Sequence, residues 1–129
     1  MMILVLSVFL LAACGVKKEI PKYKQITADE ALSVMEDEED YIILDVRTLE
    51  EFAERHIPGA ICIPNEMIGK DDIAELPDKD QLILVYCRSG NRSKQAAQKL
   101  FDMGYTNIYE FGGIIDWKGD IVTEESSGA

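Results

Sequence analysis

The sequence predicts an α/β fold with a mainly parallel sheet of about five strands and helices on both of its faces. Two apolar runs of strand length, residues 41–46 and 82–86, are nearly continuous, which is typical of strands buried on both faces. Helix-start signals lie before the first run and between the two runs, and a helical pattern at residues 91–103 follows the second. Strands that alternate with helices in this way favour parallel pairing.

The first predicted helix begins at a capping box formed by Thr27 and Glu30. The pattern after it indicates a helix that runs to about residue 35 and buries one face. The residues expected on that face are Ala31, Leu32 and Met35. An acidic turn then leads into the strand at residues 41–46.

A second capping box, Thr48 with Glu51, follows that strand directly and predicts a short helix. The residues expected to face inward from it are Phe52 and Ala53. A Pro-Gly pair then ends the helix, and residues 60–63 are apolar enough for a short strand.

The rest of the sequence continues the alternation of helices and strands. Its predicted elements are a helix at 71–76 stopped by Pro77, a strand at 82–86, a helix at 91–103 ended by Gly104, a strand at 107–111, and a final short helix holding Trp117. Binding sites in such sheets lie at the carboxyl ends of strands. We therefore expect the functional residues just after residues 46 and 86.

The stretch at residues 87–93 carries the strongest chemical signal in the chain. Cys87 lies between a predicted strand and the start of a predicted helix, where unpaired amides and the helix dipole stabilise a thiolate. Arg88 and Arg92 add positive charge beside that sulfur. The pattern indicates a reactive thiol that handles an anionic substrate.

Composition excludes several other classes of function. The 129 residues suggest one globular domain, and the formal net charge of −11 argues against nucleic acid as a partner, because a phosphate backbone requires a basic face. The three cysteines do not have the spacing of a zinc site or a dithiol motif, so we expect no metal and no cofactor. Cys62 lies in an apolar segment and is interpreted as a small buried hydrophobic residue.

The N-terminal residues predict a targeting segment. Residues 1–13 are uncharged and nearly all apolar, but this run is too short to span a bilayer. Small residues up to Cys14 resemble the lipobox of bacterial lipoproteins, although no Lys or Arg precedes the run. That resemblance implies a signal peptide at 1–13, lipid on Cys14, a polar tether at 14–22 and an extracytoplasmic, membrane-anchored protein. The alternative is an apolar N-terminus that packs on the domain.

Five motifs in order resemble a single rhodanese domain over residues 23–122, which leaves a C-terminal tail at 123–129. They are Asp45-Val46-Arg47, Glu50-Glu51-Phe52, His56-Ile57-Pro58-Gly59-Ala60, the stretch at residues 87–93, and Phe111-Gly112-Gly113 with Trp117 downstream. Arg55 departs from the pattern, because the family usually has glycine before the histidine. The resemblance implies a rhodanese-like fold.

The resemblance also implies a sulfurtransferase. Its nucleophile would be Cys87, which would take a sulfane sulfur from a small anionic donor such as thiosulfate, hold it as a persulfide and pass it to cyanide or a thiol. The residues implied to bind the substrate, chiefly through backbone amides, are Arg88, Ser89, Gly90, Asn91, Arg92 and Ser93. Gly90 lets the loop curl.

Supporting roles follow from the same resemblance. Glu51 is expected to form an ion pair with Arg92, and Asp45 with Arg47 is expected either to brace the loop or to form a purely structural pair. His56 is left out of the catalytic set, because a stabilised thiolate needs no base and the residue is better placed for capping or packing.

Two other functions remain as alternatives. Tyrosine-type phosphatases share a similar loop, but their arginine comes one residue later than Arg92 does here, so the loop at residues 87–92 is sized for sulfur rather than phosphate. A persulfide carrier at the membrane, which binds a partner with little turnover, would keep the same cysteine and arginines.

Overall fold

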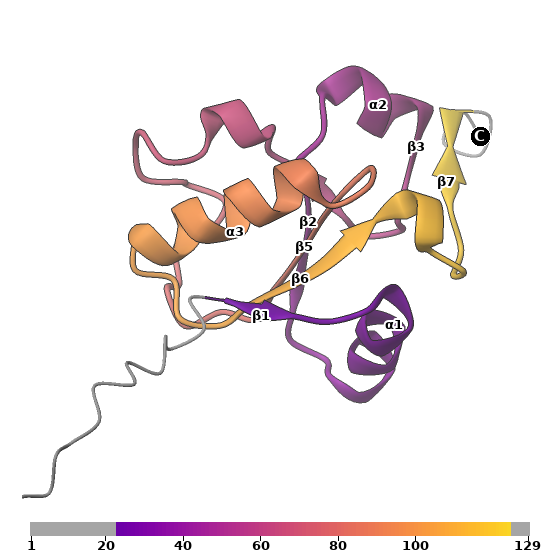
Figure 1. Ribbon diagram of the computed structural model, residues 1–129, viewed down its shortest axis with the longest axis horizontal. Helices are drawn as coiled ribbons and strands as arrows, with labels where there is room; N and C mark the ends of the chain where they lie inside the picture. Colours follow the sequence, from indigo (N-terminus) through magenta and orange to yellow (C-terminus); the bar gives the residue numbers. More distant parts are fainter. Residues whose placement is uncertain (1–22, 125–129) are drawn as a thin grey trace, which may run out of the picture.

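The computed structural model describes residues 23–124, which are built around one five-stranded sheet (Figure 1). Its strand order is β1-β6-β5-β2-β4, and every neighbouring pair is parallel. The strands are β1 (Lys24–Gln25), β2 (Ile42–Asp45), β4 (Ile61–Cys62), β5 (Ile83–Cys87) and β6 (Ile108–Gly113). The predicted fold class and the number of strands are confirmed.

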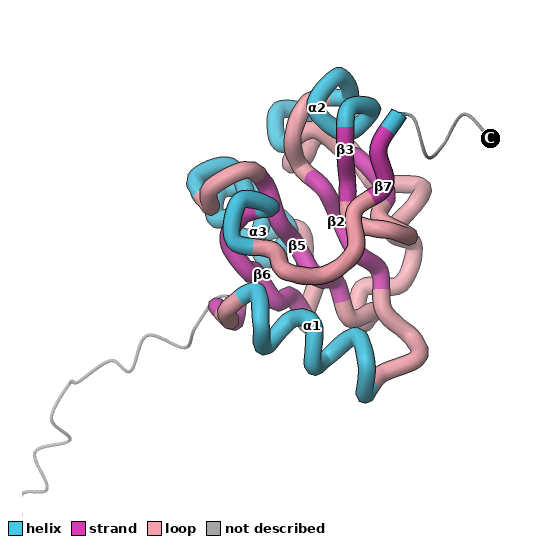
Figure 2. The backbone as a smooth tube through the Cα atoms, turned by 90° about the vertical axis from the view of Figure 1, so that its right-hand side faces the viewer, coloured by secondary structure: helices cyan, strands magenta, loops and turns pink. Residues whose placement is uncertain are grey.

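The sheet is buried on both faces, as its continuous apolar strands predict. Along β5, Val85 packs in one core with Ala96 of helix α3 (Asn91–Asp102), whereas Tyr86 packs in the other with Ala31 of helix α1 (Ala28–Asp37). Successive side chains of a strand point to opposite faces, so each strand serves both cores. Figure 2 shows α1 and α3 as separate covers of the central strands.

Both predicted capping boxes are present. Thr27 and Glu30 begin α1, and Thr48 and Glu51 begin helix α2 (Leu49–Glu54). The inward position expected for Ala53 is wrong, because its side chain is exposed. Helix α2 ends after six residues, where the chain becomes extended to pair with a distant strand.

That pairing forms a small second sheet that the sequence did not reveal. Strand β3 (Arg55–His56) is antiparallel to β7 (Val122–Thr123), so Thr123 belongs to the folded domain rather than to a tail beginning at 123. Two-residue strands leave no periodic pattern in a sequence, because their pairing depends on a remote partner.

The helix predicted at residues 71–76 is absent. The structure has instead a short 3-10 helix η1 (Asn65–Met67) and, further on, a single turn in which the Leu76 amide donates to the Ile73 carbonyl. Ile73 and Leu76 are buried, so the apolar spacing that resembled a helix anchors a turn to the core. At the other end, the short helix η2 (Ile114–Asp116) follows β6 as expected, with Trp117 as its C-cap.

The predicted signal peptide at 1–13, Cys14, the tether at 14–22 and tail residues 125–129 lie outside the described residues. Within residues 23–124, no helix has both the length and the apolar character needed to cross a bilayer.

Candidate active site

Cys87 is the last residue of β5 and stands at the entrance to α3, as predicted. Gly90 is the N-cap of α3 and has a φ of 116°, a left-handed conformation that glycine adopts without strain. The loop therefore curls back over the sulfur within three residues. The Gly90 amide donates a hydrogen bond to Cys87 Sγ at 3.0 Å.

The surroundings of Cys87 Sγ favour a thiolate despite its burial. The side chain is 1% exposed, and this desolvation raises the pKa of the thiol. The side-chain hydrogen bond between Cys87 and Ser93 and the hydrogen bonds from the Ser93, Gly90 and Ser89 amides act in the opposite direction, and the net effect is a pKa below the ordinary value. These amides make up part of the predicted cradle.

The outer side of the loop faces solvent, and the end of β6 and the residues after it contact the loop backbone. Arg88, Ser89 and Asn91 are exposed. The Arg88 carbonyl accepts a hydrogen bond from the Ile115 amide at 3.3 Å. Beneath it, a Cβ added to Gly113 would lie 1.8 Å from the Arg88 oxygen, so only glycine permits the end of β6 to approach the loop this closely.

Arg92 and Glu51 form the ion pair that the sequence predicted. Arg92 Nη1 and Nη2 lie 2.6 and 3.0 Å from the two Glu51 carboxylate oxygens. The Arg92 hydrogen bond holds the pKa of Glu51 at about 2, although burial opposes this, and Thr48 contributes further hydrogen bonds. The pair links the second capping box to the first turn of α3.

Asp45 and Arg47 also form a pair, which is fully buried. Arg47 Nη2 lies 2.7 Å from Asp45 Oδ2 and also donates to the Arg55 carbonyl at 2.6 Å. Burial lowers the pKa of Arg47, but the hydrogen bond and the charge of Asp45 outweigh it and raise the pKa overall. These contacts tie β2 to β3. In the sheet, Asp45 lies opposite Tyr86 of β5, the residue before Cys87.

Comparison with known proteins decides the family, because the model of the rhodanese-like domain matches residues 27–120. The chain belongs to the rhodanese family. It is 38% identical over 73 residues to the thiosulfate sulfurtransferase PspE of Escherichia coli, covering 57% of this chain and 70% of that protein. It is 33% identical over 106 residues to the thiosulfate sulfurtransferase GlpE of Coxiella burnetii, covering 81% of this chain and 96% of that one.

A solved structure supports the same assignment. The rhodanese-like domain of the Anabaena protein Alr3790 superposes with a TM-score of 0.70 at 30% identity, covering 79% of this chain and 81% of that one. The fold of the rhodanese domain is thus shared with this neighbour, and the family is one of sulfurtransferases.

Two residues to which the sequence analysis gave no catalytic role, His56 and Cys62, have structural surroundings in this rhodanese domain. His56 Nδ1 lies 2.8 Å from the Phe52 carbonyl, and its ring stacks on Phe52 at 3.8 Å, which are contacts of a capping and packing residue. Cys62 is half-buried rather than fully buried. Desolvation raises the pKa of its thiol to about 11, with Asp45 adding to the effect, so the thiol is protonated at neutral pH.

One residue of the site was missed by the sequence reasoning. Glu110 of β6 is 2% exposed, and its Oε1 accepts hydrogen bonds from Ser93 Oγ at 2.7 Å and from the Gly112 amide at 2.8 Å. A signal was present, because an acid interrupts an apolar strand just before the Gly-Gly turn. Nothing local indicated that the acid points toward the helix start.

Proposed function

We propose that this rhodanese domain transfers a sulfane sulfur through a persulfide on Cys87. The proposal rests on the environment of Cys87 Sγ. This sulfur lies at a helix start and accepts a hydrogen bond from the Gly90 amide at 3.0 Å, and the pKa of its thiol is lowered. A thiolate is the nucleophile in such chemistry, and here backbone amides at the helix start stabilise it.

The reaction divides into two displacements. The Cys87 thiolate attacks the outer sulfur of a donor such as thiosulfate, a new S–S bond forms, and sulfite leaves with the electron pair of the donor's S–S bond. Cyanide or a thiolate then attacks the outer persulfide sulfur, and the Cys87 thiolate leaves. No net oxidation or external cofactor is required.

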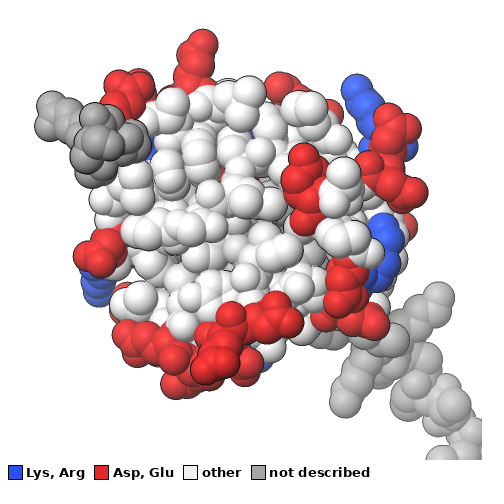
Figure 3. All heavy atoms as spheres, turned by 180° about the vertical axis from the view of Figure 1, so that it is seen from behind, with Lys and Arg blue, Asp and Glu red and all other residues white. Residues whose placement is uncertain are grey.

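The loop supplies a local attraction for an anionic donor. Acidic side chains outnumber basic ones on the face opposite α3 (Figure 3), in keeping with the net charge of −11. An anion is therefore repelled by the protein as a whole. Arg88, exposed beside Cys87, is positioned to attract the donor, and the amides of residues 88–93 receive its oxygens or the persulfide.

The test is to detect the persulfide directly. The full chain is treated with thiosulfate, polysulfide or a protein persulfide, and the mass of the peptide containing Cys87 is then measured by mass spectrometry. We expect a gain of one sulfur atom in the wild type and in Cys62→Ser, and none in Cys87→Ser. A wild-type peptide that gains no sulfur from any donor would overturn the proposal.

The same samples separate an enzyme from a carrier. A persulfide that is lost on addition of cyanide or a thiol, with repeated formation of product, marks a sulfurtransferase. A persulfide that forms but is released only slowly to these small acceptors marks the alternative, a carrier that serves a protein partner.

We also propose that lipid on Cys14 anchors the protein to a bacterial membrane outside the cytoplasm. The proposal rests on the apolar residues 1–13 and the small residues up to Cys14. We expect membrane-extracted protein to begin at a lipid-modified Cys14, and Cys14→Ser to leave the membrane fraction. A membrane-extracted chain with an unmodified Met1 and a free Cys14 thiol would disprove it.

A further inference from the structure

A chain of side-chain hydrogen bonds runs from the active sulfur into the body of the domain. Cys87 Sγ donates to Ser93 Oγ at 3.4 Å, and Ser93 Oγ donates to Glu110 Oε1 at 2.7 Å. All three side chains are almost completely buried, with exposed fractions of 1%, 0% and 2%. A proton that leaves this thiol therefore has little direct access to water.

The position of the Ser93 hydrogen follows from its possible acceptors. The hydroxyl has one hydrogen, and three oxygens lie in reach: Glu110 Oε1 at 2.7 Å, the Gly90 carbonyl at 3.0 Å and the Gly112 carbonyl at 3.2 Å. The shortest contact is to a carboxylate, which is the strongest acceptor of the three. This leaves the Ser93 lone pairs free to accept the Cys87 proton.

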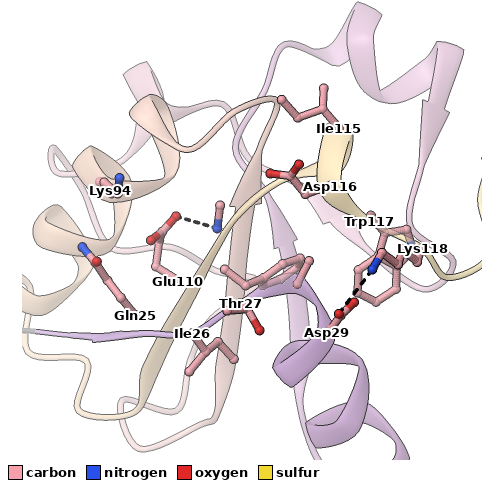
Figure 4. Close-up of a pocket in the computed structure, with 13 residues that line it drawn as sticks. Gln25, Ile26, Thr27, Asp29, Lys94, Glu110, Ile115, Asp116, Trp117 and Lys118 are labelled. Atoms are coloured by element: carbon pink, nitrogen blue, oxygen red, sulfur yellow. Dashed lines mark hydrogen bonds and ion pairs between the residues drawn. The ribbon is translucent and has the colours of Figure 1, made fainter.

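The charge of Glu110 is supported from its other side. The Gly112 amide, which can only donate, bonds to the same Oε1 at 2.8 Å. Figure 4 draws this bond as a dashed line and shows Glu110 among the residues that line a cavity. The cavity has a volume of about 610 Å³, and Lys94 of α3 also lines it. A proton that reaches Glu110 therefore arrives beside a cavity at the surface of the domain.

We propose that Ser93 and Glu110 form a proton relay that withdraws the proton of Cys87 when the thiolate forms. The S–H bond of Cys87 breaks and its electron pair stays on sulfur, while a new O–H bond forms at Ser93 Oγ. At the same time the original hydroxyl proton of Ser93 moves to Glu110 Oε1. Ser93 ends neutral and now donates to the thiolate, and Glu110 ends protonated.

Glu110 is thus a positioning residue and proton acceptor that acts through Ser93. The inference rests on the proposed function for its use, because a thiolate is what attacks the sulfur donor. Its own chemistry is independent of any donor. Several other charged groups surround this path. They are Arg88 in the loop, Arg92 in the first turn with its partner Glu51, Lys94 on α3, Asp29 on α1, and Asp116 and Lys118 after β6.

The test is the pH dependence of Cys87 alkylation by iodoacetamide, a neutral probe, followed on the Cys87 peptide of the full chain. With a relay, one proton is shared between Cys87 and Glu110. Some thiolate then persists as the pH falls, and the rate levels off over the pH range in which that one proton is shared. In Glu110→Gln the amide still accepts a hydrogen bond but no proton, so the rate falls about tenfold per pH unit without levelling.

We expect the wild type to react at least about tenfold faster than Glu110→Gln near pH 5.5. Ser93→Ala should lose the plateau, and Ser93→Thr, which keeps the hydroxyl, should retain it. Asp116→Asn removes an exposed carboxylate from the same cavity and should behave as the wild type.

A wild-type rate that keeps falling tenfold per unit down to pH 5 would overturn the relay, as would a plateau that survives in both Glu110→Gln and Ser93→Ala. A wild-type profile without a plateau overturns the relay even if a variant fails to fold. Because alkylation needs no sulfur donor, failure of the relay and failure of persulfide formation are separate results.

Discussion

Glu51 and Arg92 are joined at two points, 2.6 and 3.0 Å apart, across forty-one positions of sequence. Glu51 is the last residue of the second capping box, and Arg92 lies in the first turn of the helix that begins at the active-site loop. The Glu51 carboxylate thus completes the start of α2 and also holds Arg92, the arginine of α3. Substitution of either residue therefore tests how far this ion pair stabilises the loop.

Glu51→Gln should lower the free energy of unfolding by about 1 kcal/mol at pH 7, because the two side chains are 29% and 35% exposed and the pair is partly screened. The pKa of Glu51 is about 2 in the folded protein, below its unfolded value of roughly 4.3. Its contribution is present above the unfolded pKa and is lost as the pH falls toward 2.

Urea unfolding of the wild type and Glu51→Gln at a series of pH values measures this effect. The difference between the two proteins should shrink from about pH 5 downward. Glu30→Gln is the matched control, because Glu30 has the same place in the first capping box and accepts from the Thr27 amide. Equal losses in both variants would show that the arginine adds nothing beyond the cap.

The two described cysteines should differ sharply toward alkylating reagents at neutral pH. The pKa of Cys87 is lowered, whereas that of Cys62 is raised to about 11, which leaves less than about one Cys62 thiol in a thousand ionised near pH 7.5. Mass spectrometry of separated peptides after brief treatment with iodoacetamide should find label on Cys87 first. Labelling of Cys62 at a comparable rate would contradict this order.

Asp45→Asn should destabilise the protein by about 3 kcal/mol, because it leaves the buried guanidinium of Arg47 without its counter-charge. Asp29→Asn removes one partner of the exposed pair with Lys118, which is 3.5 Å long, and should cost about 0.5 kcal/mol or less. Urea or thermal unfolding measures both. Unchanged Cys87 alkylation in folded Asp45→Asn would identify the pair as structural. A large change would show that it braces the loop.

Gly113→Ala should disturb the active loop more than the rest of the fold. The added methyl group would overlap the Arg88 carbonyl and the Ser89 amide, and relief of that overlap should cost about 2–3 kcal/mol and move the loop away from Cys87. Persulfide formation and unfolding free energy are the two measurements. Ile115→Ala, which trims an exposed side chain on the neighbouring segment, should leave both near wild type. A Gly113→Ala protein with normal persulfide formation would show that the loop can adapt.

Elements with local signals were predicted correctly. The capping boxes at Thr27 and Thr48 are complete within four residues, so their hydrogen bonds join residues only three positions apart. The continuous strand at β5 and the helix that follows Gly90 were evident for the same reason. The helix expected at 71–76 shows the limit of periodicity, because Ile73 and Leu76 can face the core from a single turn as well as from a helix.

The sequence by itself determined the α/β class and the position of Cys87 between a strand and a helix, and the family resemblance implied the pairing of Glu51 with Arg92. Burial patterns, helix caps and loop length are all local properties of a chain. Only the tertiary structure placed Glu110 against Ser93, seventeen residues apart, and Gly113 beneath Arg88. Those contacts depend on the parallel pairing of β5 with β6, which brings together two strand ends that no local pattern connects.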